Sequence, residues 1–189
     1  YENVDYISLH KYFGNRSGDT LNFFGKIEQT GRYIQTIGGV IDYVKTKKRA
    51  KNDVHICFDE WNVWYHNRYE DKERIRTWDW PEAPALLEED YTFEDALLVA
   101  GLINEFIRRS DRVKIACIAQ LVNVIAPIRA ERGGPAWRQS IYWPYQMTSL
   151  YGRGEALNVH VDGPTYDCRV ADDVSYLDVA VTRDRQAGT

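Results

Sequence analysis

Three short apolar runs alternate with two longer amphipathic segments along this chain, and this order constrains its fold more than any other feature. The runs at residues 4–9, 53–59 and 113–119 are typical of strands, whereas residues 20–49 and 92–109 carry apolar side chains at helical steps. Strands that alternate with helices pair in parallel through right-handed crossovers. The sequence therefore predicts an α/β fold, either a doubly wound sheet or part of a (β/α)8 barrel.

The residues after each predicted strand favour the barrel. No glycine-rich phosphate-binding loop follows any of the three runs, so a nucleotide-binding sheet has little support. Each run leads into polar or aromatic side chains of a catalytic type: His10 and Tyr12, then Glu60 and Trp64, then Gln120 and Asn123. Barrel enzymes build their sites from such residues at the C-terminal ends of successive strands. Since a complete barrel has eight strands in about 250 residues, we expect this chain to be a fragment.

A change in sequence character marks the expected domain boundary. A last helical piece is expected over residues 138–151, after which a Gly-Arg-Gly turn leads into short β runs at residues 156–161 and 174–182. We assign residues 1–153 to the α/β part and residues 154–189 to the beginning of a second, all-β domain.

The segment at residues 65–91 is predicted to be a long loop that is crowded with charges and holds Trp78 and Trp80. A structureless loop of this length is uncommon in a compact domain and tends to be functional where it occurs. The two tryptophans either line an outer pocket or anchor the loop, and the sequence does not choose between these roles.

Composition limits the partners and cofactors. The formal charge of −4 argues against nucleic acid or an anionic membrane as the main partner, and no segment reaches the roughly 18 apolar residues of a membrane span. We interpret three cysteines without C-x-x-C spacing as free, buried thiols in a reducing compartment: Cys57, Cys117 and Cys168. Three histidines lack ligand spacing with nearby acids, so no metal is expected: His55, His66 and His160.

Glu60 is the strongest catalytic candidate. It follows an apolar run and is surrounded by Trp61, Trp64 and Tyr65. A sugar-cleaving enzyme needs a carboxylate that attacks or stabilises the anomeric carbon, and aromatic rings that stack on the sugar. The surplus of six Trp and thirteen Tyr fits carbohydrate binding, with barrel packing as the alternative. A surface ion pair is the alternative role for Glu60 itself.

The neighbours of Glu60 have alternative roles that the residues alone leave open. A hydrogen bond from the Tyr12 hydroxyl would keep Glu60 ionised, although Tyr12 is otherwise a core aromatic. His10 either holds a carboxylate or a sugar hydroxyl, or is a packed, satisfied histidine. Asp59 is expected to point to the opposite side of the strand from Glu60, because side chains alternate, and to serve the barrel wall.

Several segments of this sequence resemble those of glycoside hydrolase family 51, the intracellular-type α-L-arabinofuranosidases. They span nearly the whole chain, in order: residues 7–15, 58–65, 94–97, 115–128 and 137–142. The resemblance implies a (β/α)8 barrel followed by a β-sandwich, and hydrolysis with retention. The three strands then correspond to the sixth, seventh and eighth of the barrel, and the residues after about 153 begin the sandwich.

The same resemblance implies roles for individual residues. Glu60 matches the nucleophile at the end of strand seven, and Tyr12 matches a tyrosine that can hydrogen-bond it. Trp64 matches a tryptophan of the arabinose pocket, and Gln120 a glutamine that contacts the sugar; packing and backbone satisfaction are the alternatives for these two. The acid/base Glu of the family follows an Asn on strand four, upstream of residue 1, and the pair Asn104-Glu105 lies in a helix and does not qualify.

The resemblance also implies partners and a location. We expect a cofactor-free enzyme that acts on arabinan, arabinoxylan or their oligosaccharides, that is cytoplasmic and bacterial, and that forms homo-oligomers, hexamers in many family members. The first residue is not Met, so the true N-terminus is expected to be absent and secretion is not excluded. The alternatives are another retaining barrel glycosidase, of the xylosidase or glucanase type, and an inactive remnant with a sugar-binding or structural role.

Overall fold

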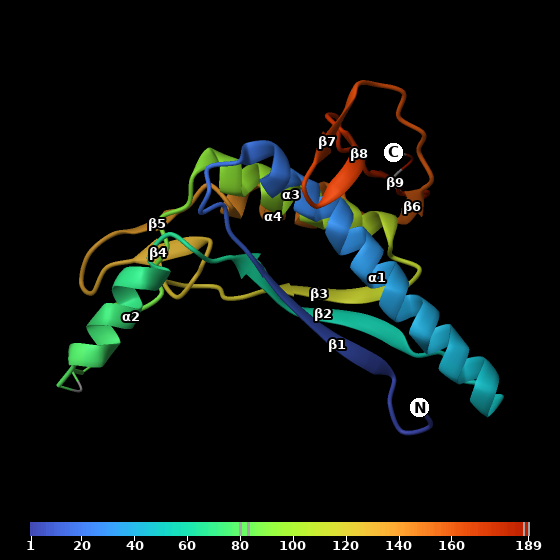
Figure 1. Cartoon of the computed structure of the whole chain (residues 1–189), viewed down its shortest axis with the longest axis horizontal. Coiled ribbons are helices and arrows are strands. Elements are labelled where there is room, and N and C mark those ends of the chain that lie inside the picture. The colour runs from blue at the N-terminus through green and yellow to red at the C-terminus, as the bar shows by residue number, and fades with distance from the viewer. Residues whose placement is uncertain (80, 83, 187, 189) are drawn as a thin grey trace.

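Three parallel strands form the central sheet of the molecule (Figure 1). The computed structural model describes residues 1–79, 81–82, 84–186 and 188. The strands lie in the order β1 (Tyr6–Phe13), β2 (His55–Val63) and β3 (Val113–Ile118). Helices intervene between successive strands, as the α/β prediction requires. The mixed α/β character expected from the sequence is therefore confirmed.

Three helices lie on one face of this sheet (Figure 1): α1 (Thr20–Lys48), α3 (Phe93–Arg108) and α4 (Tyr142–Tyr151). Asp19 begins α1, because its carboxylate accepts the backbone N–H of Asn22 at 3.0 Å. Thr92 and Asp95 form a capping box at the start of α3. The glycine pair near the middle of α1 does not interrupt that helix.

The hydrophobic core lies between the sheet and these helices. Ile56, Phe58 and Trp61 of β2 face Leu98 and Leu102 of α3, and all five are fully buried. Burying each of these side chains contributes about 1.5–3 kcal/mol. The core therefore fastens the helices to one face of the sheet and leaves the opposite face for polar residues.

The third strand differs from the sequence expectation. The nearly continuous apolar run at residues 113–119 is typical of a strand buried on both faces, but Ile115 is 39% exposed and Cys117 is exposed. Among the described residues β3 pairs only with β2, and no helix covers its other face. All three cysteines are free, as predicted, but none is fully buried, since Cys57 and Cys168 are half-buried. The expectation of buried thiols is therefore wrong.

The long polar segment contains a helix that the sequence did not indicate. α2 (Arg68–Thr77) lies within the predicted loop at residues 65–91. Its only buried residue is Asp71, whose Oδ2 accepts the Leu87 N–H at 2.8 Å. Without an apolar face, such a helix has no periodic signal. Trp78 follows α2 directly, and Trp80 lies outside the described residues.

The remainder of the chain forms short antiparallel pairs. β4 (Ile128–Ala130) pairs with β5 (Ala136–Arg138), so the helix expected from residue 138 begins only at Tyr142. Two further pairs follow: β6 (Glu155–Leu157) with β9 (Val181–Arg183), and β7 (Thr165–Cys168) with β8 (Ala171–Ser175). The β7–β8 hairpin packs on the first half of α1, where Gly25 lies against Cys168 and Val170.

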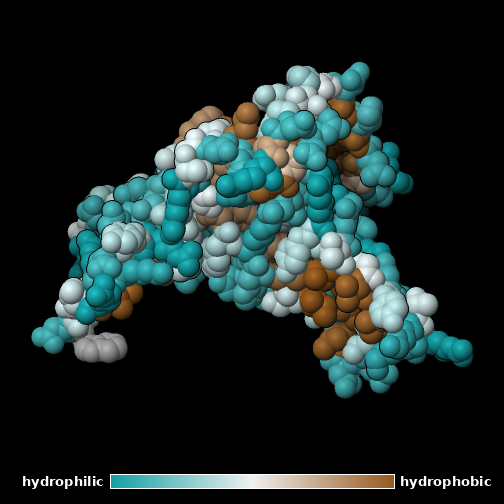
Figure 2. Space-filling view, in the orientation of Figure 1, coloured by the Kyte–Doolittle hydropathy of each residue, from teal (hydrophilic) through white to brown (hydrophobic). Residues whose placement is uncertain are grey.

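Part of the apolar surface remains uncovered. Figure 2 shows a hydrophobic patch beside β1 and below α1, and the exposed apolar residues of β1 and α1 include Ile7 and Val40. None of the helices in the described residues has the length and apolarity needed to cross a membrane.

Candidate active site

A register shift in the sheet decides which side chains meet at the end of β2. Ser8 pairs with Cys57 and His10 with Glu60, so β2 advances three residues, from 57 to 60, while β1 advances two, from 8 to 10. An extra residue of this kind, a β-bulge, changes the direction in which the neighbouring side chains point. Asp59 Oδ1 and Glu60 Oε2 both approach the His10 ring, at 3.4 and 3.3 Å. The expectation that Asp59 points away from Glu60 is therefore wrong.

Glu60 has a neighbour at each carboxylate oxygen. The Tyr12 hydroxyl donates to Oε1 at 2.5 Å, and His10 Nδ1 lies 3.3 Å from Oε2. The Glu60 side chain remains 41% exposed, so a ligand can reach it. Burial and the hydrogen bond to Glu60 raise the pKa of the Tyr12 hydroxyl well above its usual range. Tyr12 therefore stays protonated and can stabilise negative charge on Glu60.

His10 links Glu60 to a second carboxylate. Ser8 Oγ donates to Asp59 Oδ1 at 2.7 Å and lies 3.2 Å from His10 Nε2. The hydrogen bond from Ser8 lowers the pKa of Asp59, so Asp59 is ionised near neutral pH. His10 thus contacts both neighbouring carboxylates.

Trp64 and Arg68 form a wall beside Tyr12. The Trp64 ring meets the Tyr12 ring edge-on, with 5.3 Å between centroids. The Trp64 backbone N–H donates to Phe13 O at 2.8 Å, which extends the contact between the two strands. The Arg68 guanidinium lies 4.6 Å from the centre of the Trp64 ring. Trp64 is half-buried, so its ring differs from the fully buried aromatics of the core.

Gln120 lies at the same end of the sheet, just beyond β3. Ala119 N donates to Trp61 O at 3.1 Å, and Asn62 Nδ2 donates to Ala119 O at 2.7 Å. These bonds hold the chain before Gln120 against β2. The Gln120 side chain is exposed, and within the described residues no hydrogen bond joins it to Glu60. Sequence reasoning missed Asn62, whose only signal is a polar side chain among apolar neighbours in a strand.

A second missed residue fixes the chain that follows Trp64. The fully buried carboxylate of Glu89 accepts three successive backbone N–H groups, from Tyr65, His66 and Asn67, at 3.2, 2.7 and 3.0 Å. His66 Nε2 in addition lies 2.8 Å from Asp95 at the start of α3. Glu89 belongs to the polar segment after β2, where no sequence pattern distinguishes one acid from the next.

The remaining polar candidates serve the backbone or the packing. Asn123 Oδ1 accepts the Ala130 N–H at 2.8 Å and its Nδ2 donates to the Ala130 carbonyl at 3.0 Å. Glu105 is buried in α3 and bonds Arg108 and Arg109, as expected for a residue outside the strand ends. No group of three or more His, Cys, Asp or Glu residues within the described ranges could hold a metal.

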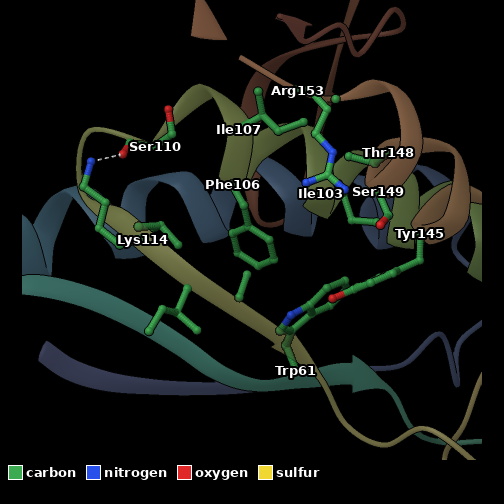
Figure 3. A pocket seen from close by; sticks show the side chains of 14 residues that line it. Trp61, Ile103, Phe106, Ile107, Ser110, Lys114, Tyr145, Thr148, Ser149 and Arg153 are labelled. Atoms are coloured by element: carbon green, nitrogen blue, oxygen red, sulfur yellow. Dashed lines mark hydrogen bonds between the residues drawn. The ribbon is translucent and has the colours of Figure 1, made fainter. Parts of the chain in front are cut away.

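A separate apolar hollow of about 330 Å³ opens at the free edge of β3, beneath α3 and α4 (Figure 3). Trp61, Phe106 and Tyr145 line its floor and wall, with Trp61 and Tyr145 stacked at 6.5 Å. Glu60, Tyr12 and His10 are not among its lining residues, so this hollow is distinct from the candidate site.

The arrangement around Glu60 suits a nucleophile better than a proton donor. The carboxylate is accessible, receives a hydrogen bond and stands beside a pair of aromatic rings. Retaining glycosidases pair such a carboxylate with a second carboxyl group about 5–5.5 Å away, which acts as acid and base. Asp59 is poorly suited to that second role, because its lowered pKa keeps it ionised.

Comparison with known families gives one matching model. The model describes the C-terminal domain of α-L-arabinofuranosidases and matches residues 59–187. The match begins within β2, one residue before Glu60, and extends through the four short strands at the end of the chain.

Individual relatives give a consistent result. The chain is 50% identical to an intracellular exo-α-(1→5)-L-arabinofuranosidase of Halalkalibacterium halodurans and 48% identical to one of Bacillus subtilis. These alignments cover 99% and 100% of this chain but 37% of each relative. The chain thus spans little more than a third of the length of the curated relatives it matches.

Solved structures resemble it as well. A family 51 α-L-arabinofuranosidase from Bifidobacterium longum superposes with a TM-score of 0.89 at 36% identity, over 99% of this chain and 38% of that one. An α-L-arabinofuranosidase from Thermotoga maritima, solved as an arabinose complex, gives a TM-score of 0.67 at 29% identity, over 86% of this chain and 30% of that one.

Proposed function

Because this chain belongs to the α-L-arabinofuranosidases of glycoside hydrolase family 51, we propose that it is the nucleophile-bearing part of an enzyme that removes terminal α-L-arabinofuranosyl residues with retention. The hydrogen bond from the Tyr12 hydroxyl to Glu60, at 2.5 Å, carries this proposal. It stabilises a carboxylate at a strand end, beside the Trp64 ring that a sugar can stack on.

We further propose that β1, β2 and β3 are the last three strands of a (β/α)8 barrel. Residues 1–153 then belong to the barrel and residues 154–189 to the beginning of a β-sandwich. Two observations support this: the strands are parallel with the helices on one face, and the polar site residues occupy the other face and the C-terminal strand ends. The strands missing from the barrel would complete the site over the open face.

In the proposed reaction, Glu60 attacks the anomeric carbon and a glycosyl ester forms as the bond to the leaving oxygen breaks. The leaving oxygen takes its proton from an acid/base carboxyl group, which we place in the remaining part of the barrel. That group then deprotonates a water, which attacks the anomeric carbon and releases Glu60. Tyr12 and His10 hold Glu60 in place, and Trp64 and Gln120 contact the sugar.

The relatives suggest the substrate and the location. Those from Halalkalibacterium halodurans and Bacillus subtilis are named intracellular exo-α-(1→5)-L-arabinofuranosidases. We assign this protein to the same class: a cytoplasmic, cofactor-free enzyme for arabinan, arabinoxylan or their oligosaccharides, with a homo-oligomeric assembly that the family resemblance makes a hexamer. Nucleic acid and membranes are not partners in this proposal, in line with a formal charge of −4.

The decisive experiment is covalent labelling of the full-length protein with a 2-fluoro arabinofuranosyl inactivator, followed by peptide mapping in a mass spectrometer. We expect one sugar adduct, on Glu60. Glu60→Gln should abolish the adduct and lower kcat by at least about a thousandfold, whereas Asp59→Asn, one residue away, should still be labelled.

Other outcomes have distinct meanings. An adduct on a different carboxylate would refute the assignment of Glu60. Labelling by the xylosyl analogue alone would indicate another retaining barrel glycosidase. The absence of label from both reagents, in a protein that still binds arabino-oligosaccharides, would favour a sugar-binding role without catalysis.

A further inference from the structure

A cavity of about 350 Å³ adjoins the candidate site on the side of Tyr12 and Trp64. Four cationic side chains line it, contributed by separate parts of the chain: Arg16 after β1, Lys26 in α1, Arg68 at the start of α2 and Arg169 in the β7–β8 turn. None of its lining residues is an acid. The fold therefore gathers positive charge beside the site from distant points of the sequence.

None of the four cations forms an ion pair with a carboxylate of the described residues. Arginines elsewhere in the molecule do have one: Arg112 binds Asp42 at 2.7 Å and Arg129 binds Glu88 at 2.8 Å. In contrast, no ion pair within the described part of the chain involves Arg16, Arg68 or Arg169.

Lys26 shows that the positive charge is crowded. Its Nζ donates to the Gly14 carbonyl at 2.5 Å. Burial, followed by the nearby charge of Arg169, lowers the pKa of Lys26. Asp19 is an acid that acts on Lys26 in the opposite sense, but its carboxylate is engaged as the cap of α1. An anion in the cavity would relieve this repulsion.

The cavity also has an aromatic lining that points to a sugar. Tyr12, Trp64 and Tyr65 contribute to its wall, and Tyr12 itself donates to Glu60. A simple inorganic anion makes no use of aromatic rings, whereas a pyranose or furanose can stack on them. Arginine forks match the planar carboxylate of an acidic sugar with two parallel hydrogen bonds.

From this geometry we infer that the cavity binds a uronate, the carboxylate-bearing sugar unit of an acidic glycan, next to the arabinofuranosyl residue that is cleaved. The inference rests on the proposed function, because it places the uronate in the same substrate. It extends that function by assigning acidic, arabinose-decorated glycans as preferred substrates, selected by Arg16, Lys26, Arg68 and Arg169.

The test compares two substrates in the full-length protein. One is an arabinofuranosyl oligosaccharide with a neighbouring uronate, and the other is the same compound with the carboxyl group reduced to a neutral alcohol. We expect kcat/KM to be about tenfold higher for the uronate substrate at low salt, mainly through KM. The preference should shrink as ionic strength rises.

Four variants locate the effect: two remove a charge from the cavity, one keeps the charge there, and one removes a charge elsewhere as a control. Arg16→Gln and Arg169→Gln should each reduce the preference for the uronate about three- to fivefold. Arg169→Lys should keep only part of it, because lysine retains the charge but not the planar fork. Lys51→Gln removes an equal charge after the far end of α1, outside the cavity, and should leave the preference unchanged. Hydrolysis of the neutral substrate by each variant verifies its folding.

The contrary results distinguish a failure of the uronate site from a failure of the proposed function. Equal turnover of both substrates by the wild-type protein would overturn the uronate site while leaving the proposed function intact. Inhibition by inorganic phosphate without any uronate preference would overturn it in favour of a free-anion site. No turnover of either substrate, and no binding of the uronate compound in calorimetry, would refute both.

Discussion

At the scale of single residues, the Tyr12 hydroxyl is the group that holds one oxygen of the Glu60 carboxylate. Its pKa is raised by burial and by the carboxylate beside it, so it acts as a fixed donor and not as a base. The edge-on contact with Trp64 holds its ring in place. Tyr12 thus connects the aromatic wall with the candidate nucleophile.

Tyr12→Phe removes this donor while keeping the ring. We expect kcat of the full-length enzyme to fall about ten- to a hundredfold, because a hydrogen bond to a charged group contributes about 1.5–3 kcal/mol. Steady-state kinetics with an aryl arabinofuranoside would measure the loss. Tyr43→Phe, in an exposed tyrosine of α1, is the matched control, and equal activity of the two variants would contradict the role of Tyr12.

The site residues around Glu60 could be predicted from the sequence, because the end of an apolar run is recognisable from a few neighbouring residues. Tyr12, Glu60 and Trp64 follow apolar runs, and the structure brings all three together. The orientation of Asp59 was not predictable, because it depends on a register shift between two strands. The meeting of Arg16 with Arg169 depends on how the β7–β8 hairpin packs on α1, which no local pattern encodes.

At the scale of secondary structure elements, the packing of α1 against α3 depends on a close approach at Gly31. The Glu105 carboxylate of α3 occupies the place that a Cβ at Gly31 would need. That carboxylate cannot move aside freely, since Arg108 Nη2 donates to it at 2.6 Å and Arg109 Nε at 2.8 Å. Gly39, eight residues along the same helix, faces open space.

The two glycines should therefore respond in opposite ways to alanine. Gly31→Ala should destabilise the protein by about 1–3 kcal/mol through overpacking. Gly39→Ala should stabilise it by about 0.5–1 kcal/mol, because alanine is the better helix former and meets no neighbour. The midpoint of thermal unfolding measures both changes, and a stabilised Gly31→Ala variant would show that α3 does not pack as closely as described.

The contact between His66 and Asp95 should make the stability of the segment after β2 depend on pH. The hydrogen bond to Asp95 raises the pKa of His66 above its ordinary value of 6.5. A raised pKa stabilises the folded state fully below pH 6.5, and this contribution is lost as the pH rises through the folded-state pKa. The contact is therefore strongest under mildly acidic conditions.

His66→Gln should consequently lower the free energy of unfolding more at pH 5.5 than at pH 8.5. Urea unfolding of both proteins at the two pH values measures the difference. His160→Gln, in an exposed histidine of the C-terminal part, should show no such dependence. A cost for His66→Gln that is the same at both pH values would mean that the charged form of His66 is not stabilised.

Elements with an apolar period were predictable, and the others were not. α1 and α3 appear within one residue or so of their expected ends, because each carries a buried stripe and a capping residue. α2 has only Asp71 buried and no such stripe, so sequence analysis assigned it to a loop. The hairpin of β4 and β5 was likewise missed, because strands of three residues are too short to show alternation.

At the scale of the whole molecule, the central sheet is covered by helices of the described residues on one face only (Figure 1). Helices and core cover one face, whereas His10, Asp59 and Glu60 occupy the other. Within the described residues, β1 and β3 each pair with β2 alone, which leaves an unpaired edge on either side. This arrangement fits a segment of a closed barrel, in which further strands would pair with both edges.

Expressed by itself, the 189-residue chain should therefore be inactive and should self-associate, because an unpaired, partly apolar strand edge is a template for other chains.

Ile115 on the edge strand β3 is 39% exposed and belongs to the apolar hollow of Figure 3. A lysine there should reduce self-association by blocking that edge, so Ile115→Lys should shift the isolated chain towards monomer in sedimentation velocity. Thr36→Lys adds the same charge on α1 at an exposed polar residue, and should leave the distribution unchanged. A monomeric wild-type chain with a cooperative thermal transition and arabinofuranoside turnover would show that three strands suffice without the rest of a barrel.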